Sequence, residues 1–192
     1  MDSYFFLGAQ LPHLNYEQGM PMSSADFIAL VQNKMSSKDS SIFKYCTLNP
    51  CSVPDSDSGK TAKKIKSDFI KRWNEWEESL RLNLASGRAK KLKRQDAAAL
   101  PSGTNEDAAV VAKHALSLES PLEAEMFLDK ARWNAIDNLK GMSIFSESAM
   151  YAYFLKLLLM ERRACFNTEE GFAEYKRLYA AILADAGTGE AK

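Results

Sequence analysis

The stretch Ser120–Phe166 reads SPLEAEMFLDKARWNAIDNLKGMSIFSESAMYAYFLKLLLMERRACF and carries the longest apolar run of the chain. Its opening, Ser120–Glu123, is a capping box with proline at the first helical position. Gly141 suits the left-handed conformation in which many helices end. Ser146 is a good cap for a second helix. This stretch therefore predicts a helical hairpin around which the rest of the chain packs.

Apolar residues at three-and-four spacing predict further helices on both sides of the hairpin. Shorter helices are expected over about residues 24–36 and 106–118, and a last one after Thr168. The longest should run from Ala62 to about Leu92, with one apolar stripe formed by Ile65, Phe69, Trp73, Trp76, Leu80 and Leu84. The predicted fold class is all-α, a multi-helix bundle of packed helical hairpins.

The N-terminal segment Tyr4–Pro12 is aromatic and shows no polar face. Its composition favours an extended state, although the first turns of a buried helix also fit, and a lone strand would need a partner. The fold prediction therefore includes a short extended aromatic N-terminal segment. A boundary near residues 100–105 divides the chain into an N-terminal half, residues 1–100, and a C-terminal hairpin half, residues 101–192, as one compact domain or two subdomains.

Composition is that of a globular protein with its own core: 192 residues, 46% hydrophobic and 26% charged. The N-terminus lacks the basic region of a signal peptide. The longest low-charge run, residues 148–160, contains Lys156 and is shorter than the ~20 residues that a spanning helix needs. We therefore expect no transmembrane segment and a cytoplasmic protein.

Catalytic and metal-binding chemistry has few candidates. The chain holds only two histidines, His13 and His114, and neither has a recognisable partner for acid–base work. The three cysteines are an odd count without a zinc-binding pattern. We expect no catalytic residues, no metal and no cofactor, and thus not an enzyme.

Charge is unevenly distributed although the net charge is zero. Residues 60–94 hold 12 Lys and Arg against 4 Asp and Glu, whereas the segments on either side are acidic. This segregation favours intramolecular pairing or docking on an acidic partner. The candidate partner-binding residues are Lys63, Lys64, Lys71, Arg72, Arg81, Arg88, Lys90, Lys91, Lys93 and Arg94.

Two other groups of charges are interpreted structurally. Asp129 and Arg132 stand three residues apart on one helix and are predicted to form an ion pair. The run Glu161–Arg163 is interpreted as a solvated helix end, with a polar cluster beneath the hairpin as the alternative. Neither group predicts a ligand site.

Four short motifs give the chain a family resemblance: YFFLGAQLP at 4–12, LNLASGRA at 82–89, LDKARW at 128–133 and YFLKL at 153–157. Together they resemble a small uncharacterised family encoded among the subunits of bacterial V/A-type ATPases. The hairpin is also similar in style to the repeated helical units of the central-stalk socket, which joins the rotor shaft to the membrane ring in these ATPases. At 192 residues the chain would be a shortened relative of that socket.

The resemblance implies a non-catalytic subunit or assembly factor that couples the soluble head to the membrane ring. Its partners would be other ATPase subunits, on the rotor shaft or the membrane ring. It would then lie in the cytoplasm at the inner face of the cell membrane, held there through partners. The alternative is a helical adaptor that binds an acidic partner or nucleic acid through residues 60–94. Binding of nucleic acid is disfavoured, because the basic run is accompanied neither by aromatic residues that could stack on bases nor by a recognition-helix motif.

Overall fold

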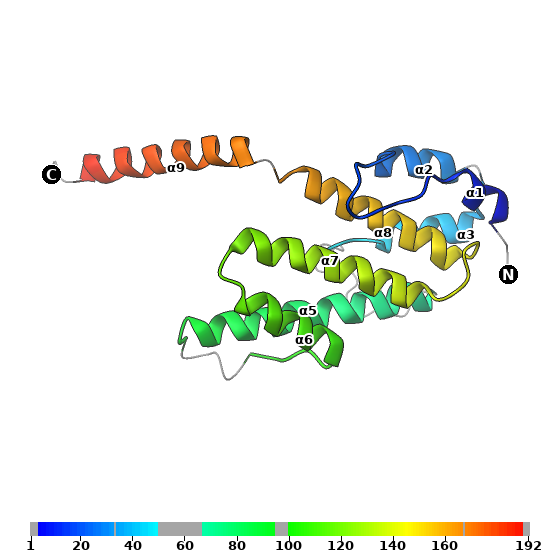
Figure 1. The fold of residues 1–192 in the computed structure, drawn as a ribbon, viewed down its shortest axis with the longest axis horizontal. Coiled ribbons are helices and arrows are strands. Elements are labelled where there is room, and N and C mark those ends of the chain that lie inside the picture. The colour runs from blue at the N-terminus through cyan, green and yellow to red at the C-terminus, as the bar shows by residue number, and fades with distance from the viewer. Residues whose placement is uncertain (1–3, 33, 50–66, 95–99, 167, 190–192) are drawn as a thin grey trace.

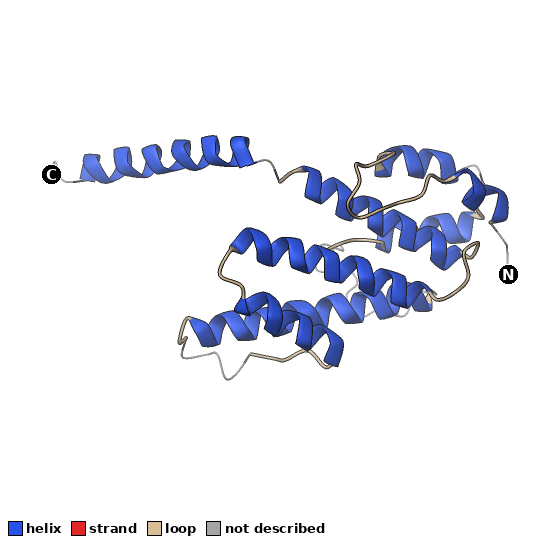
Figure 2. Ribbon diagram, in the orientation of Figure 1, coloured by secondary structure: helices blue, strands red, loops and turns tan. Residues whose placement is uncertain are grey.

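The computed structural model of the protein describes residues 4–32, 34–49, 67–94, 100–166 and 168–189. Within these ranges the chain forms helices and no strand, as Figure 2 shows, which confirms the all-α prediction. The helices are α1 (Phe5–Gln10), α2 (Ser24–Gln32), α3 (Ser37–Ser40), the 3₁₀ helix η1 (Ser41–Tyr45), α5 (Asp68–Lys91), α6 (Glu106–Ser117), α7 (Pro121–Lys140), α8 (Glu147–Ala164) and α9 (Thr168–Gly189).

The body of the molecule is a bundle in which α8 occupies the middle (Figure 1). Helix α7 packs on one side of α8, followed by α5 and α6, while α2 packs on the other side. In Figure 1, α9 continues away from the end of α8 and lies outside the bundle. The predicted hairpin, α7 and α8, therefore does form the centre of the fold.

Local capping sets the ends of the long helices, because the first amides of a helix need acceptors outside it. Ser120 Oγ accepts from the Glu123 amide at 3.4 Å, with Pro121 in the first turn. Ser146 caps α8 in the same way. Gly141 ends α7 with φ of 75°, a conformation that disfavours a side chain. These predicted boundaries are confirmed.

The predicted extended N-terminal segment is wrong, because residues 5–10 form α1. With no strand beside it, this segment satisfies its backbone locally, as the Gly8 amide donates to Tyr4 O at 2.8 Å. The Tyr4 amide donates to Phe145 O at 2.9 Å, which fixes α1 against the loop between α7 and α8. Leu7 is the buried residue of α1.

Three helix ends lie at other residues than the sequence predicted. Ser67 is extended and caps α5, so this helix begins at Asp68; residues 62–66, including Ile65, lie outside the described residues. Helix α2 ends at Gln32 rather than near residue 36. Helix α9 continues to Gly189, where the sequence predicted a frayed tail from residue 186.

A single buried core joins the bundle, and the α5 stripe contributes Phe69, Trp73, Trp76, Leu80 and Leu84 to it. Each such side chain contributes roughly 1.5–3 kcal/mol by burial. The segment before α6 packs tightly on α5, since a Cβ on Gly103 would lie 2.3 Å from the Ser79 carbonyl oxygen. The proposed division at residue 100 stays a prediction, but both sides of it contribute to this core.

Candidate functional site

The basic residues of α5 do not form one continuous patch. Several of them bind the protein itself. Arg81 donates to Glu77, Asn49 and the carbonyl of Leu48, at 2.6–3.0 Å. Arg72 Nη2 donates to Leu139 O at 3.0 Å, near the C-terminal end of α7. These two arginines act as structural anchors in the described structure.

The C-terminal end of α5 holds the remaining predicted cations. Lys91 Nζ donates to Leu116 O at the end of α6, and Arg88 approaches Glu125 at 3.9 Å. Positive groups near helix C-termini are favourable because the last carbonyls lack helical partners. Lys90, Lys93 and Arg94 are exposed there.

Of the other predicted residues, Lys71 lies at the opposite end of α5 and pairs with Asp68 at 3.6 Å. Lys63 and Lys64 lie outside the described residues. A helix of this length places its two ends about 36 Å apart. The predicted set is therefore split between two ends of the bundle.

A chain of charged side chains crosses the interior between α5, α7 and α8. Arg132 donates to both carboxylate oxygens of Glu77, at 3.0 and 3.1 Å, and to Asp129 at 3.1 Å, which confirms the predicted ion pair. Arg162 of α8 extends the network to Asp129 at 3.4 Å and Glu125 at 2.6 Å. The network joins three helices that carry most of the core.

Burial shapes the protonation of this network. Burial raises the pKa of Asp129 despite the opposing charges of Arg162 and Arg132. Burial alone would lower the pKa of Arg132, but the carboxylates of Glu77 and Asp129 outweigh it and raise the pKa. The guanidinium of Arg132 therefore stays charged, and the network serves to hold helices rather than to move protons.

The end of α8 is not a solvated end; it is the polar cluster that the sequence offered as the alternative. Glu161 accepts from the Ser24 amide at 2.6 Å and from Ser24 Oγ at 2.9 Å, at the start of α2. Arg163 donates to Tyr16 O, and its guanidinium lies 4.8 Å from the centre of the Tyr16 ring. These contacts fasten the N-terminal segment to α8.

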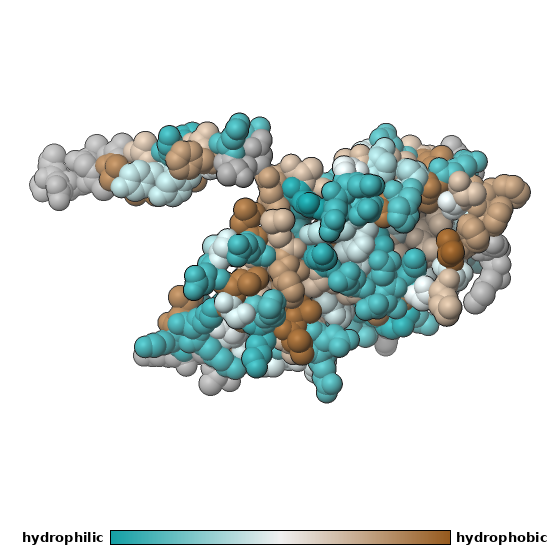
Figure 3. Space-filling model, in the orientation of Figure 1, coloured by the Kyte–Doolittle hydropathy of each residue, from teal (hydrophilic) through white to brown (hydrophobic). Residues whose placement is uncertain are grey.

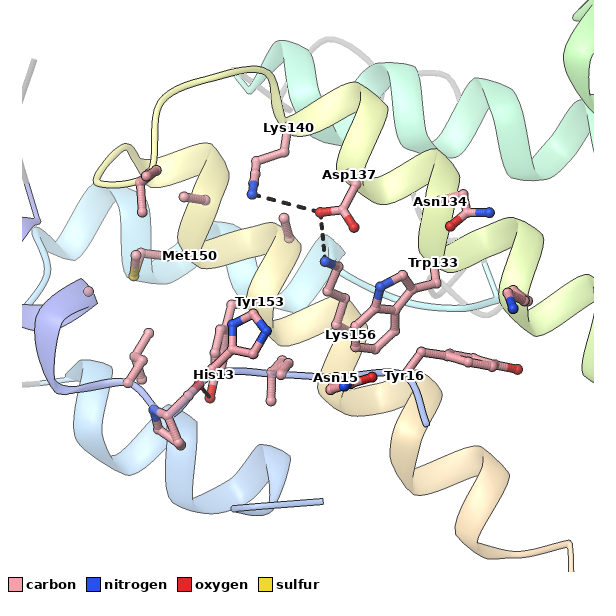
Figure 4. Close-up of a pocket in the computed structure, with 18 residues that line it drawn as sticks. His13, Asn15, Tyr16, Trp133, Asn134, Asp137, Lys140, Met150, Tyr153 and Lys156 are labelled. Carbon is pink, nitrogen blue, oxygen red and sulfur yellow. Dashed lines mark hydrogen bonds and ion pairs between the residues drawn. The ribbon is translucent and has the colours of Figure 1, made fainter. Parts of the chain in front are cut away.

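A cavity of about 680 Å³ lies between residues 11–16, α7 and α8 (Figure 4). Asp137 accepts from Lys156 at 2.6 Å and pairs with Lys140 at 3.7 Å. The Lys156 ammonium also lies 4.4 Å from the centre of the Trp133 ring. Burial lowers the pKa of Lys156, with Asp137 opposing that shift.

This cavity offers little chemistry beyond packing. His13 lines it, but the one carboxylate, Asp137, is already shared by two ammonium groups (Figure 4). Catalysis needs a nucleophile or base oriented by a partner. The pair in the cavity walls that comes nearest to this, Lys156 and Asp137, is joined in an ion pair at 2.6 Å. Among the described residues no group of three or more metal-ligating side chains comes together.

Helix α9 presents the most unusual surface of the molecule. Every side chain described in it, residues 169–183, is exposed. Six of these are large and apolar, with exposed fractions of 49–66%: Phe172, Tyr175, Leu178, Tyr179, Ile182 and Leu183. We call this set the α9 face. Figure 3 shows brown side chains on this arm, away from the body. The sequence pattern indicates a buried face, yet nothing in the described structure covers it.

A smaller apolar patch lies at the other end of the molecule, where α1 meets the loop between α7 and α8 (Figure 1). It holds Phe5, Phe6, Met142 and Ile144, all at least half exposed. Phe5 packs against Phe145 with ring centres 4.6 Å apart. We call this set the loop patch. The α9 face and the loop patch mark the two ends of the molecule.

Comparison with protein-family models, curated proteins and solved structures gives no match for the chain. Among the described residues, none of the helices has the length and hydropathy required to cross a membrane.

Sequence reasoning missed two features. Glu77 lies four residues after Trp73 and three before Leu80, so helical spacing already placed a carboxylate on the apolar stripe of α5. That signal could have predicted its burial with a cationic partner. The exposure of the α9 face had no comparable signal.

Proposed function

We propose that this protein is a non-catalytic subunit or assembly factor of a bacterial V/A-type rotary ATPase, where it couples the soluble head to the membrane ring. The observation that carries the proposal is the α9 face, because an apolar helix face of this size is found where proteins contact one another. The resemblance in four motifs supplies the identity of the assembly.

The build of the bundle supports a coupling role. The network of Glu77, Arg132, Asp129 and Arg162 braces α5, α7 and α8, and Glu161 fastens α2 to α8. The loop patch lies at one end of this braced body, and α9 with its apolar face extends from the other end (Figure 1). A component that couples two parts of an assembly needs two separate contacts, and a braced bundle next to one of them resists deformation. Membrane association would then come through partners.

The test is co-purification of the tagged full-length protein from a bacterium that carries its gene and the ATPase genes. We expect ATPase subunits to be recovered, and ATPase assembly to fall in a deletion strain. Tyr175→Asp with Tyr179→Asp should abolish the recovery, whereas Ala173→Asp with Ala180→Asp, on the other side of α9, should not. Recovery of no ATPase subunit, with unchanged assembly in the deletion strain, would contradict the proposal.

A second candidate function is a helical adaptor that binds an acidic partner or nucleic acid through the end of α5. The exposure of Lys90, Lys93 and Arg94 favours it. Binding by these residues should weaken steeply with salt. A gel shift at physiological ionic strength that disappears with Lys90→Glu and Lys93→Glu would support the adaptor, and its absence would favour the ATPase proposal.

A further inference from the structure

The α9 face is wider than one helix can cover. At about 100° per residue, its side chains occupy an arc of about 140°, with Leu178 at one margin and Leu183 at the other. Tyr175, Tyr179 and Ile182 lie between these margins. A strict two-helix coiled-coil seam uses a narrower stripe, whereas apolar stripes wider than about 100° are typical of helices that face the core of a globular protein. Two neighbouring helices, one on each side of α9, would cover both margins.

Its area leads to the same result. The six side chains of the α9 face have exposed fractions of 49–66%. Because a large aromatic side chain has a surface of about 150–250 Å², the six together expose roughly 600 Å². Stable interfaces bury about 600–1,000 Å² on each partner, so the whole α9 face must be covered to reach the lower end of that range. A second copy of α9 alone would cover the middle of the arc fully, but Leu178 and Leu183, which flank it, only in part. A surface that wraps both margins comes much closer to the required area.

The charges around the α9 face point to an uncharged partner surface. Glu174 accepts from Arg177 at 2.8 Å within the helix. The Lys176 ammonium lies 4.5 Å from the centre of the Phe172 ring. Helices that lie on membranes carry a lysine- and arginine-rich polar face, whereas residues 168–183 hold three glutamates against Lys176 and Arg177. An anionic lipid surface is therefore a poor match, and an apolar protein groove is a good one.

We propose that the α9 face docks lengthwise into a groove between two helices of one partner protein, lined by aliphatic side chains. The groove would extend over at least the 12 residues from Phe172 to Leu183, about 17 Å of helix. Leu178 contacts one wall of the groove and Leu183 contacts the other. The docking mode follows from α9 itself; only the partner's identity, an ATPase subunit, rests on the proposed function.

Site-specific photo-crosslinking of the full-length chain tests the two walls separately. A photoreactive phenylalanine analogue replaces Leu178 or Leu183, and Ala173, about 150° from the centre of the face, serves as the matched control. All three positions are exposed, so the fold should tolerate the analogue. The crosslinks are formed in cells that express the chain with its ATPase, and the linked peptides are mapped by mass spectrometry.

We expect positions 178 and 183 to link to two different helical segments of the same partner chain, and position 173 to give at most a tenth of their yield. Links from both margins to one segment, links to a second copy of this chain, or no links at either margin would overturn the groove. Crosslinks to two segments of a protein outside the ATPase would uphold the groove and contradict the proposed function. Crosslinks from both positions to one segment of an ATPase subunit would contradict the groove and uphold the proposed function.

Discussion

Helices α5 and α9 contrast in what happens to the same kind of sequence pattern. Both carry large apolar residues at three-and-four spacing, and both are more than twenty residues long. On α5 the described stripe is buried to 6% exposure or less, whereas on α9 the exposed fractions start at 49%. Periodicity therefore predicts that a helix has an apolar face, and says nothing about which molecule covers it.

The largest difference in unfolding free energy between a buried and an exposed region should come from substituting the buried charges. Arg132→Met would remove the cation that the buried carboxylates of Glu77 and Asp129 share and leave them only Arg81 and Arg162, at a cost of about 3–5 kcal/mol in unfolding free energy. Urea unfolding followed by circular dichroism measures this loss. Lys90→Met, on the exposed end of α5, should change stability by less than about 0.5 kcal/mol. A loss below about 1 kcal/mol in Arg132→Met would show that the network does not brace the bundle.

The second-largest difference in unfolding free energy should come from a matched pair of leucines, one buried and one exposed. Leu157 of α8 is fully buried and Leu183 of α9 is 55% exposed. Leu157→Ala should lower the unfolding free energy by about 2–5 kcal/mol, because it removes buried methyl groups and leaves a cavity. Leu183→Ala should change it by less than about 0.5 kcal/mol in the isolated protein. Equal losses in the two variants would mean that α9 is packed in solution.

Alkaline pH should destabilise the bundle. Burial raises the pKa of Tyr153 to about 12, and its hydroxyl donates to Pro12 O at 2.9 Å. Because the unfolded chain releases this proton near pH 10, stability is complete below that pH and falls as pH rises toward 12. Solvent screening limits the change to about 1 kcal/mol. Unfolding measured from pH 9 to 12 should show a shallower decline in Tyr153→Phe, and an identical decline would contradict this assignment.

The smallest effect should come from removing α9. A chain that ends after Phe166 loses the whole α9 face but none of the contacts that join α5, α7 and α8. Its urea transition should keep the same midpoint within about 0.2 M, since the buried area of the bundle is unchanged. Co-purification with partners should be lost at the same time. A lower midpoint would show that α9 folds back onto the bundle.

Local signals account for what the sequence predicted well. Ser120, Pro121 and Gly141 act within a few residues of their own helix end, so both ends of α7 could be predicted. Trp73 and Trp76 lie on a regular stripe, and they are buried as expected. In each case the physical cause lies within one or two turns of the residue.

Long-range contacts account for what the sequence did not predict. Arg72, Arg81 and Lys91 were candidates for partner binding because they are basic, yet each donates to a carbonyl oxygen elsewhere in the bundle. Glu161 likewise meets Ser24 across 137 positions. Only the packing of the helices brings such groups together, so composition and spacing could not reveal them.

The position of α8 in the middle of the bundle has a consequence for synthesis on the ribosome. Phe27 and Phe43, from the first quarter of the chain, pack against Phe154 with ring centres 5.8 and 5.4 Å apart. Tyr151 donates to Asp39 O across 112 positions. At roughly 5–20 residues per second, the early aromatic residues wait on the order of 10 s for α8 to emerge. During that interval the nascent chain exposes apolar surface, which makes it a natural client for chaperones that bind during translation.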